Sequence, residues 1–295
     1  MSTGHAGGRH RWRLAASFAL IATFLVVELV AALVSGSLAL LSDAGHMAAD
    51  VVALGAALVA TRVATRPDDT GRRTFGSYRA EVFASGIAVL LMLGVSVYVV
   101  VEAVGRIGSP AAPDAGPMLL VGALGLVVNV AALVLLRSGA GESLNVKGAY
   151  LEVLADTVGS VGVLGAGWLV AATGSGVWDT VVALAVGAFV AIRAVLLGRE
   201  VLAVLGQQAP AGVTVDAVAA DLAAIDGVDD VHDLHVWTLT SGMNVATAHL
   251  VAADPTAGPR VLDEARRRLR TRHGIEHATV QVETTADRSC HELGW

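Results

Sequence analysis

The sequence has few charged and few aromatic residues, and it has only one cysteine. Asp, Glu, Lys and Arg make up 16% of its 295 residues, and aromatic residues make up 4%. A soluble domain carries about 25% charged residues, so this shortage excludes an ordinary soluble protein unless one local stretch causes it. The single cysteine, Cys290, excludes a disulfide within the chain. The net charge of −6 and the lack of a basic stripe give no indication of nucleic-acid binding.

Long apolar runs recur from Leu14 to Leu197, so the shortage of charge is not local. We predict six membrane-spanning helices, each long enough to cross a hydrocarbon core of about 30 Å. Their predicted ranges are Leu14–Val34, Leu38–Val63, Ala80–Gly105, Met118–Leu136, Ala149–Ala172 and Val177–Leu197. The basic N-terminus before the first run resembles a signal peptide. The run is long and further spans follow it, which favours an uncleaved first helix.

The segments that flank these spans alternate in charge along the chain. The segments on one side carry most of the basic residues: Arg9, Arg11, Arg13, Arg62, Arg66, Arg72, Arg73, Arg137, Lys147, Arg193 and Arg199. The other side has short connectors and only Arg106 beside them. Because basic excess marks the cytoplasmic side, we predict a multi-pass protein of the cell membrane with both termini in the cytoplasm.

The character of the sequence changes after Pro210. Helical periodicity and strand-like alternation follow one another in the order αββαβ, which predicts a small open α/β sandwich. The predicted elements are Val213–Ile225, Val228–Leu239, Asn244–Ala252, Pro259–Arg272 and Ile275–Glu283. The chain is thus divided into a tail (1–13), a membrane domain (14–200), a cytoplasmic domain (210–284) and a second tail (285–295). So small a domain would gain from pairing with a second copy.

Two pairs of ionisable residues lie within the apolar spans, at the same spacing. His46 and Asp50 are four residues apart in the second span, and Glu152 and Asp156 are four apart in the fifth. Residues four apart share a helix face, roughly 6 Å from each other along the axis. Counted from the span ends, both pairs lie about 13 Å deep, near the midplane where transporter sites occur. Because the two spans run in opposite directions, the pairs can face each other.

Grouped in this way, the four residues form a predicted site for a divalent metal. Imidazole and carboxylate ligands suit Zn²⁺, which favours a tetrahedron of four. Three carboxylates carry more negative charge than the metal needs, so we expect a proton to share the site. The alternative is that these groups only hydrogen-bond between helices. Isolated polar residues in spans often do so, but two matched pairs favour the metal.

Further ionisable residues lie in the spans without such a pattern. Glu28, in the first span, could support the site, carry a proton or form a structural hydrogen bond. Asp43 precedes His46 and could be a carboxylate on the access route or a polar group in the first helical turn. Glu102 and Arg106 are four residues apart near the outer edge and predict an ion pair at the membrane interface.

Several motifs resemble those of the cation diffusion facilitator family of zinc and cadmium transporters. They are Glu28-Leu29, GSLALLSDAGHMAAD at 36–50, FGSYRAE at 75–81, SLNVKGAYLEVLAD at 143–156, VHDLHVW at 231–237 and TVQVE at 279–283. The resemblance covers nearly the whole chain. It implies a homodimeric exchanger that moves a divalent cation out of the cytoplasm against protons and carries a cytoplasmic metallochaperone-like domain.

The sequence departs from the family pattern at the membrane site and in the loops. Zinc-transporting members usually have histidine where Glu152 stands. A carboxylate hardens the site and better tolerates Mn²⁺, so we expect weaker discrimination in favour of zinc. Many members have histidines between the second and third or the fourth and fifth spans. The loops 66–74 and 137–147 of this chain contain none.

The C-terminal domain and the tail after it contain a second group of metal-binding residue types. The resemblance implies metal binding by His232, His249 and Glu283. His235 follows His232 by three residues in a predicted strand, so we expect it to point to the opposite face. Cys290 could add the soft ligand that zinc sites use.

The remaining histidines are weaker candidates for metal binding. His291 is adjacent to Cys290 and could bind the same metal. His277 could be an accessory ligand or a surface histidine. His5 and His10, in the N-terminal tail, are more easily read as incidental.

Three classes of function remain in view. The favoured one is a metal–proton antiporter, with zinc ahead of manganese, cobalt and cadmium, and with Zn²⁺ also bound in the cytoplasmic domain. The second is a membrane-bound metal sensor, although no output module accompanies it. The third is an intramembrane metallopeptidase, which would need a water-activating His-Glu-x-x-His helix that the sequence lacks. We therefore expect a transporter rather than an enzyme.

Overall fold

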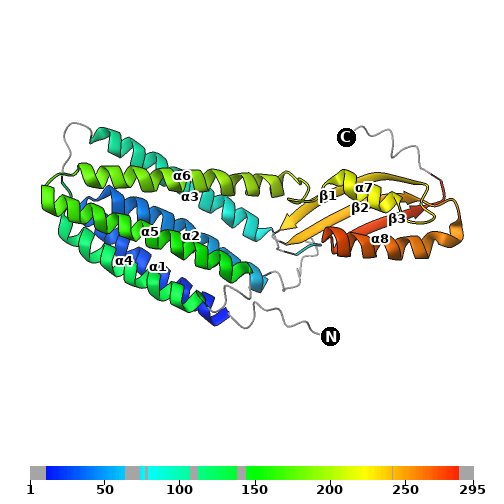
Figure 1. The fold of residues 1–295 in the computed structure, drawn as a ribbon, viewed down its shortest axis with the longest axis horizontal. Coiled ribbons are helices and arrows are strands. Elements are labelled where there is room, and N and C mark those ends of the chain that lie inside the picture. Colours follow the sequence, from blue (N-terminus) through cyan, green and yellow to red (C-terminus); the bar gives the residue numbers. More distant parts are fainter. Residues whose placement is uncertain are drawn as a thin grey trace. The chain divides into compact units, whose positions relative to one another are not determined.

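The structure is a computed structural model, and it describes residues 11–63, 74–76, 79–106, 112–137, 144–240 and 242–285. The chain forms two compact units. One comprises Met1–Arg62 and Phe83–Gly198, and the other comprises Val63–Val82 and Arg199–Trp295 (Figure 1). His5, His10, Cys290 and His291 lie outside the described residues.

Six long helices run through the first unit. They are α1 (Arg11–Ser35), α2 (Leu38–Val63), α3 (Ala80–Gly105), α4 (Ala115–Arg137), α5 (Leu144–Thr173) and α6 (Val177–Leu205). Among the described residues, five of them, α1 and α3 to α6, contain stretches long and apolar enough to span a membrane. α2 has 26 residues and contains the polar residues Asp43, His46 and Asp50. The predicted helical membrane domain is confirmed, with α5 and α6 extending further than their apolar cores indicated.

The helices turn large apolar side chains outward. Val34 is 78% exposed, Leu120 is 72% exposed and Leu90 is 70% exposed. Monomeric soluble proteins rarely expose such continuous apolar surface, whereas a bilayer solvates it. Inside the bundle, α4 packs against both α1 and α5. A Cβ on Gly45 would lie within 2.3 Å of the Val95 side chain, so glycine permits the close approach of α2 and α3.

The start of α2 is held by a buried carboxylate from another helix. Asp179, in the first turn of α6, is fully buried. It accepts hydrogen bonds from the Ser37 hydroxyl at 2.6 Å and from the backbone N–H groups of Leu38 at 2.9 Å and Ala39 at 3.1 Å. An anion is favourable there because the first N–H groups of a helix have no partner within it. Asp179 thus fixes the height at which α2 presents its polar residues.

Arg106 lies beside this cap and joins the same corner of the bundle. Its guanidinium is 3.7 Å from Asp179 and donates to the Gly36 carbonyl at 3.0 Å. It also lies 3.5 Å from Glu102, which confirms the ion pair predicted from their spacing.

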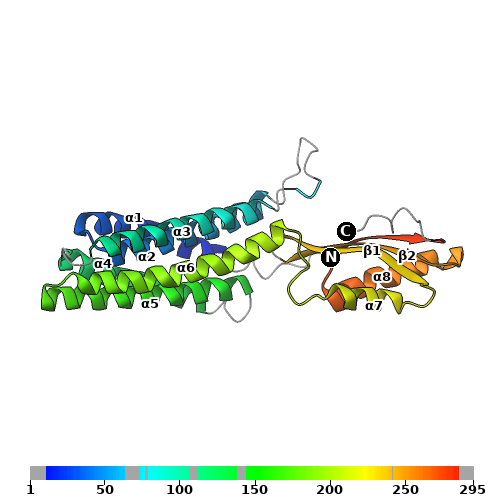
Figure 2. The same ribbon diagram turned by 90° about the horizontal axis from the view of Figure 1, so that it is seen from above.

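The second unit contains a three-stranded sheet covered by two helices. Its elements are α7 (Val215–Ala223), β1 (Asp230–Thr240), β2 (Met243–Val251), the short 3-10 helix η2 (Pro255–Ala257), α8 (Gly258–His273) and β3 (His277–Glu283). β2 is the central strand, antiparallel to β1 and parallel to β3. Figure 2 shows α7 and α8 on one side of the sheet. The predicted αββαβ order is confirmed.

The core of this unit lies between the sheet and its two helices. It includes Val236, Ala246, Leu250, Val261 and Leu269. Side chains alternate between the two faces of a strand. Those of β2 and β3 that alternate with core residues such as Ala246, Leu250 and Val280 therefore point to the face without helices.

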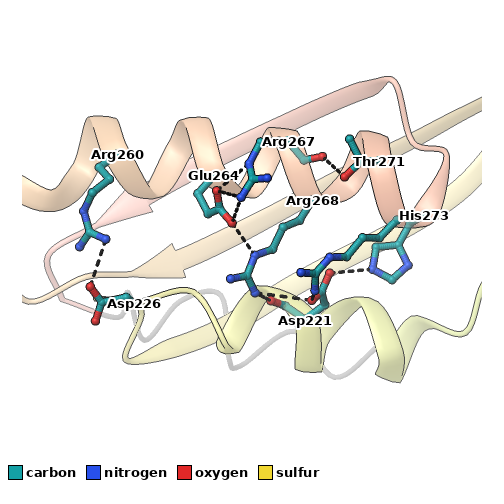
Figure 3. A network of polar contacts seen from close by, with 9 residues as sticks. Asp221, Asp226, Arg260, Glu264, Arg267, Arg268, Thr271 and His273 are labelled. Carbon is teal, nitrogen blue, oxygen red and sulfur yellow. Dashed lines mark hydrogen bonds and ion pairs between the residues drawn. The ribbon is translucent and has the colours of Figure 1, made fainter.

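Acidic residues pair with the arginines of α8, as Figure 3 shows. Asp221 of α7 interacts with Arg272 and with His273 at 3.2 Å, and Arg268 donates to its backbone carbonyl at 2.7 Å. Hydrogen bonds from Arg268 and Arg267 hold the pKa of Glu264 below its usual range. These contacts tie α8 to α7 and offset the positive charge of the α8 arginines.

Candidate metal centres

Three of the four predicted membrane ligands lie together between α2 and α5. One ligand atom each from His46, Asp50 and Asp156 falls within 4.8 Å of the others. His46 Nε2 is 3.3 Å from Asp156 Oδ1 and 3.7 Å from Asp50 Oδ2. The i, i+4 spacing aims His46 and Asp50 at the same point, and α5 brings Asp156 to them. The structure therefore supports the predicted meeting of the two helices, and metal binding itself stays a prediction.

The three side chains are buried without full hydrogen bonding. His46 is 2% exposed, Asp50 is 7% exposed and Asp156 is 2% exposed. Among the described residues, His46 Nδ1, Asp50 Oδ2 and Asp156 Oδ1 have no hydrogen-bond partner. Two carboxylates in such surroundings are costly unless a cation or protons compensate them. One imidazole and two carboxylates fit a divalent cation as ligands.

Glu152, the fourth predicted ligand, lies outside this cluster and pairs with a residue that the sequence patterns missed. It forms an ion pair with Arg193 of α6. Arg193 also lies 2.9 Å from His46 Nε2 through its Nη1. From the sequence, Arg193 was predicted to lie at the cytoplasmic edge of the membrane, because it is close to the end of the sixth apolar run. Its long side chain instead reaches Glu152 and the ring of His46.

A cavity of about 610 Å³ lies beside the cluster, between α2, α5 and α6. Its lining is apolar apart from Asp43 and His46. Asp43 lies in the second turn of α2 and is 3% exposed. Its carboxylate comes so close to Gly159 that a Cβ there would lie 2.9 Å from the oxygen, so glycine makes room for it. This placement fits a carboxylate on an access route.

Glu28 lies deep inside the bundle, on α1. It is 2% exposed, and its carboxyl group interacts electrostatically with that of Asp43. Glu28 Oε2 has no hydrogen-bond partner among the described residues. Glu28 therefore belongs to the surroundings of the site, and its supporting, proton-carrying or structural role stays open.

The second cluster lies on the helix-free face of the C-terminal sheet. His232 of β1 and His249 of β2 are directly paired across the strands, with ring centroids 5.4 Å apart. Glu283 of β3 completes the group, with carboxylate oxygens 3.1 Å from His249 Nδ1 and 3.6 Å from His232 Nε2. The three residues offer ligand atoms within 4.8 Å of one another. Their geometry fits the metal binding that the resemblance implies.

The prediction that His235 points to the opposite face from His232 is wrong. The strand register shifts between them, so that His232 pairs with His249 and His235 pairs with Thr247. His249 and Thr247 are two residues apart on β2 and share a face, and paired residues point the same way. A bulge near Asp233, whose φ is 51°, adds one extra residue to β1. The side chain of His235 therefore returns to the face on which His232 lies. His235 contacts Asp233 at 2.9 Å and is not part of the cluster.

His277 does not join this group of ligands either. It is exposed on β3, and its ring lies 5.5 Å from that of Phe75. This fits the surface alternative. The predicted contributions of Cys290 and His291 fall outside the described residues.

The two units together define a class of protein. A bundle of lipid-facing helices encloses one buried histidine–carboxylate cluster, and an α/β domain carries another. This is the organisation of a multi-pass membrane protein that handles divalent cations. Residues 14–205 match the family model of the cation efflux transmembrane domain, and residues 210–285 match that of the cation efflux protein cytoplasmic domain. The chain belongs to the cation efflux family, the cation diffusion facilitators, whose members export divalent metal cations.

Curated relatives match nearly the whole chain. The metal cation efflux system protein CzcD of Cupriavidus metallidurans is 41% identical over 284 residues, covering 96% of this chain and 89% of that protein. The zinc transporter ZitB of Escherichia coli is 34% identical, covering 95% and 88%. A cadmium, cobalt and zinc/H⁺–K⁺ antiporter of Bacillus subtilis is 32% identical, covering 97% and 93%. The relatives named here are transporters, and their names contain different metals.

Among solved structures, the metal-bound C-terminal domain of the CzcD transporter from Cupriavidus metallidurans is similar in sequence. It is 37% identical and covers 24% of this chain and 99% of that one, with a TM-score of 0.23.

Proposed function

We propose that this protein exports a divalent cation, zinc before others, in exchange for protons across the cell membrane. The proposal rests chiefly on the cluster of His46, Asp50 and Asp156, which is buried inside a lipid-facing bundle. A buried site whose ligands come from two helices can be opened by moving those helices relative to each other. In the proposed orientation both termini are cytoplasmic.

Proton exchange follows from the ligand chemistry. Metal ligands must be deprotonated, so metal binding releases protons and acid promotes metal release. When the metal leaves, protons can take its place on the carboxylates, and the site never stays strongly charged in hydrocarbon. We include Glu152 as the fourth ligand in the loaded site, because it lies one helical turn from Asp156 on the same face of α5.

Zinc is the proposed main substrate. An imidazole and carboxylates are ordinary zinc ligands, and relatives named as zinc transporters support the choice. Glu152 stands where zinc-transporting members usually have histidine. We expect manganese to compete better with zinc at this site than at a site with two histidines, because manganese prefers oxygen ligands.

We expect purified protein in lipid vesicles to take up Zn²⁺ faster than Mn²⁺, Co²⁺ or Cd²⁺ at equal free concentration. The measurement is metal-resolved uptake, with each metal buffered and counted separately. Vesicles without protein give the leak rate. Uptake of Mn²⁺ that equals or exceeds that of Zn²⁺ would show that the substrate has been assigned wrongly.

For the C-terminal domain we propose regulation in a homodimer. His232, His249 and Glu283, with Cys290 as a further ligand, would hold Zn²⁺. Metal bound there would draw two copies of the domain together. Closure would favour the transport-competent state of the dimer through the difference in metal affinity between the open and closed domains.

A His232→Ala/His249→Ala double variant should lose the metal bound to the domain but keep transport at saturating metal. Activation at low metal should weaken, because the bound metal no longer biases the dimer. Metal content of the purified protein and uptake rate against metal concentration are the two measurements. His235→Ala is the matched control, because it removes a histidine from the same face but outside the cluster. Complete loss of transport at saturating metal would contradict a purely regulatory role.

A further inference from the structure

Arg193 is a basic side chain held at the membrane metal cluster. Its Nη1 lies 2.9 Å from His46 Nε2, and its Nη2 forms the ion pair with Glu152. The guanidinium also lies over the ring of Phe189, 5.9 Å from its centre. The Arg193 side chain is 24% exposed, so these contacts are partly shielded. It is therefore fixed among the groups that are proposed to bind the metal.

The contact with His46 determines which atom carries the lone pair. A guanidinium has only donors, so His46 Nε2 must be the acceptor of its N–H. Nε2 is also the ring nitrogen that faces Asp50 and Asp156. A cation bound by that cluster would use the same lone pair. Arg193 and the metal therefore cannot both bind Nε2 at one time.

We propose that Arg193 is a resident cation of the transport site, which binds His46 and Glu152 when no metal is present and must be displaced when metal enters. This inference rests on the proposed function and adds a competing group to it. In the empty site, Arg193 compensates carboxylate charge that would be costly in hydrocarbon. The positive charge thus eases the return of the empty transporter and weakens metal binding.

The proposal and a purely structural role predict opposite changes in metal affinity when Arg193 is replaced. If Arg193 only held α6 against α2 and α5, its removal would loosen the ligands and weaken metal binding. If Arg193 competes with the metal, its removal tightens metal binding. Coupling between two binding sites of a protein commonly changes affinity by about 5–150-fold, and an effect of that order is measurable.

The binding experiment uses the full chain with the His232→Ala/His249→Ala changes, so that the C-terminal cluster does not add to the signal. Zn²⁺ binding to purified protein is measured by calorimetry. Arg193→Gln removes the charge but keeps a polar side chain, and should bind Zn²⁺ on the order of tenfold more tightly. Arg193→Lys keeps the charge and should stay near the starting affinity. Arg199→Gln, an exposed arginine of the same helix, is the matched control.

Transport gives a second and independent readout. In Arg193→Gln both the KM for Zn²⁺ and the maximal uptake rate should fall, because metal is held more tightly and the empty site returns without its cation. Arg199→Gln should leave both values unchanged. A structural defect would instead raise the KM while lowering the rate.

Weaker or unchanged Zn²⁺ binding by Arg193→Gln overturns the proposal. So does tighter binding by Arg193→Lys to the same extent, because charge would then not be the cause. If Arg193→Gln does not fold, Arg193→Met serves in its place with the same expectation. If the wild-type protein moves no metal, the proposed function fails on its own. If it does move metal but the affinity of the variant does not rise, only the resident cation fails.

Discussion

Replacement of Asp156 or Asp50 by alanine should abolish metal transport. Each is a proposed ligand in a site with few alternatives, and each is at most 7% exposed, so water cannot easily replace the lost carboxylate. Even loss of a group that only supports a metal ligand commonly costs about 10–100-fold. We therefore expect uptake to fall by more than about 100-fold. The measurement is zinc uptake into vesicles that contain equal amounts of folded protein.

Two controls separate loss of a ligand from loss of the fold. Asp156→Asn keeps the shape of the side chain but removes its charge, and should be nearly as inactive as Asp156→Ala. Glu200→Ala removes an exposed carboxylate of α6, and this variant should take up zinc at the normal rate. Size-exclusion profiles should match the wild type for all variants. Wild-type uptake by either Asp50→Ala or Asp156→Ala would refute the assignment of the site.

The second large effect is expected from the pH gradient. Vesicles that are more acidic inside than outside should accumulate zinc, because protonation promotes metal release into the interior. At equilibrium, each pH unit of difference drives about a tenfold accumulation per exchanged proton. Reversal of the gradient should reverse the direction of net movement.

The measurement follows zinc with one dye and internal pH with another in the same vesicles. Collapse of the gradient with a protonophore should stop net accumulation, and zinc entry should make the interior less acidic. The ratio of the two signals gives the number of protons per metal. Zinc movement that ignores the gradient and displaces no protons would rule out antiport.

The parts of the fold that depend on local patterns could be predicted from the sequence. The six helices and the order αββαβ follow from apolar run length and from periods of 3.6 and 2, which neighbouring residues determine. The limits of α5 and α6 could not, because these helices continue past their apolar runs to Leu144 and Leu205. An apolar run records the thickness of hydrocarbon, and a helix can extend beyond it.

The error at His235 has a similar origin. Counting residues assumes that side chains alternate between the two faces of a strand without interruption. One bulge between His232 and His235 moves every later side chain of β1 to the face opposite to the one that counting predicts. Asp233 adopts a left-handed backbone there, which aspartate tolerates better than most residues. The apolar residues that pack on the core mark this position, because Val231 and Leu234 are three residues apart whereas Leu234 and Val236 are two apart.

The membrane site divides in the same way between sequence and structure. The sequence by itself determined that His46 and Asp50 share one face of α2, and that Glu152 and Asp156 share one face of α5, because helix geometry fixes residues four apart. Only the tertiary structure decided that Asp156 joins the first pair and that Glu152 meets Arg193 instead. Those contacts depend on how three helices are rotated and offset, and on where a long side chain can reach. Such distances between helices are set by packing across the whole bundle and leave no local pattern in the chain.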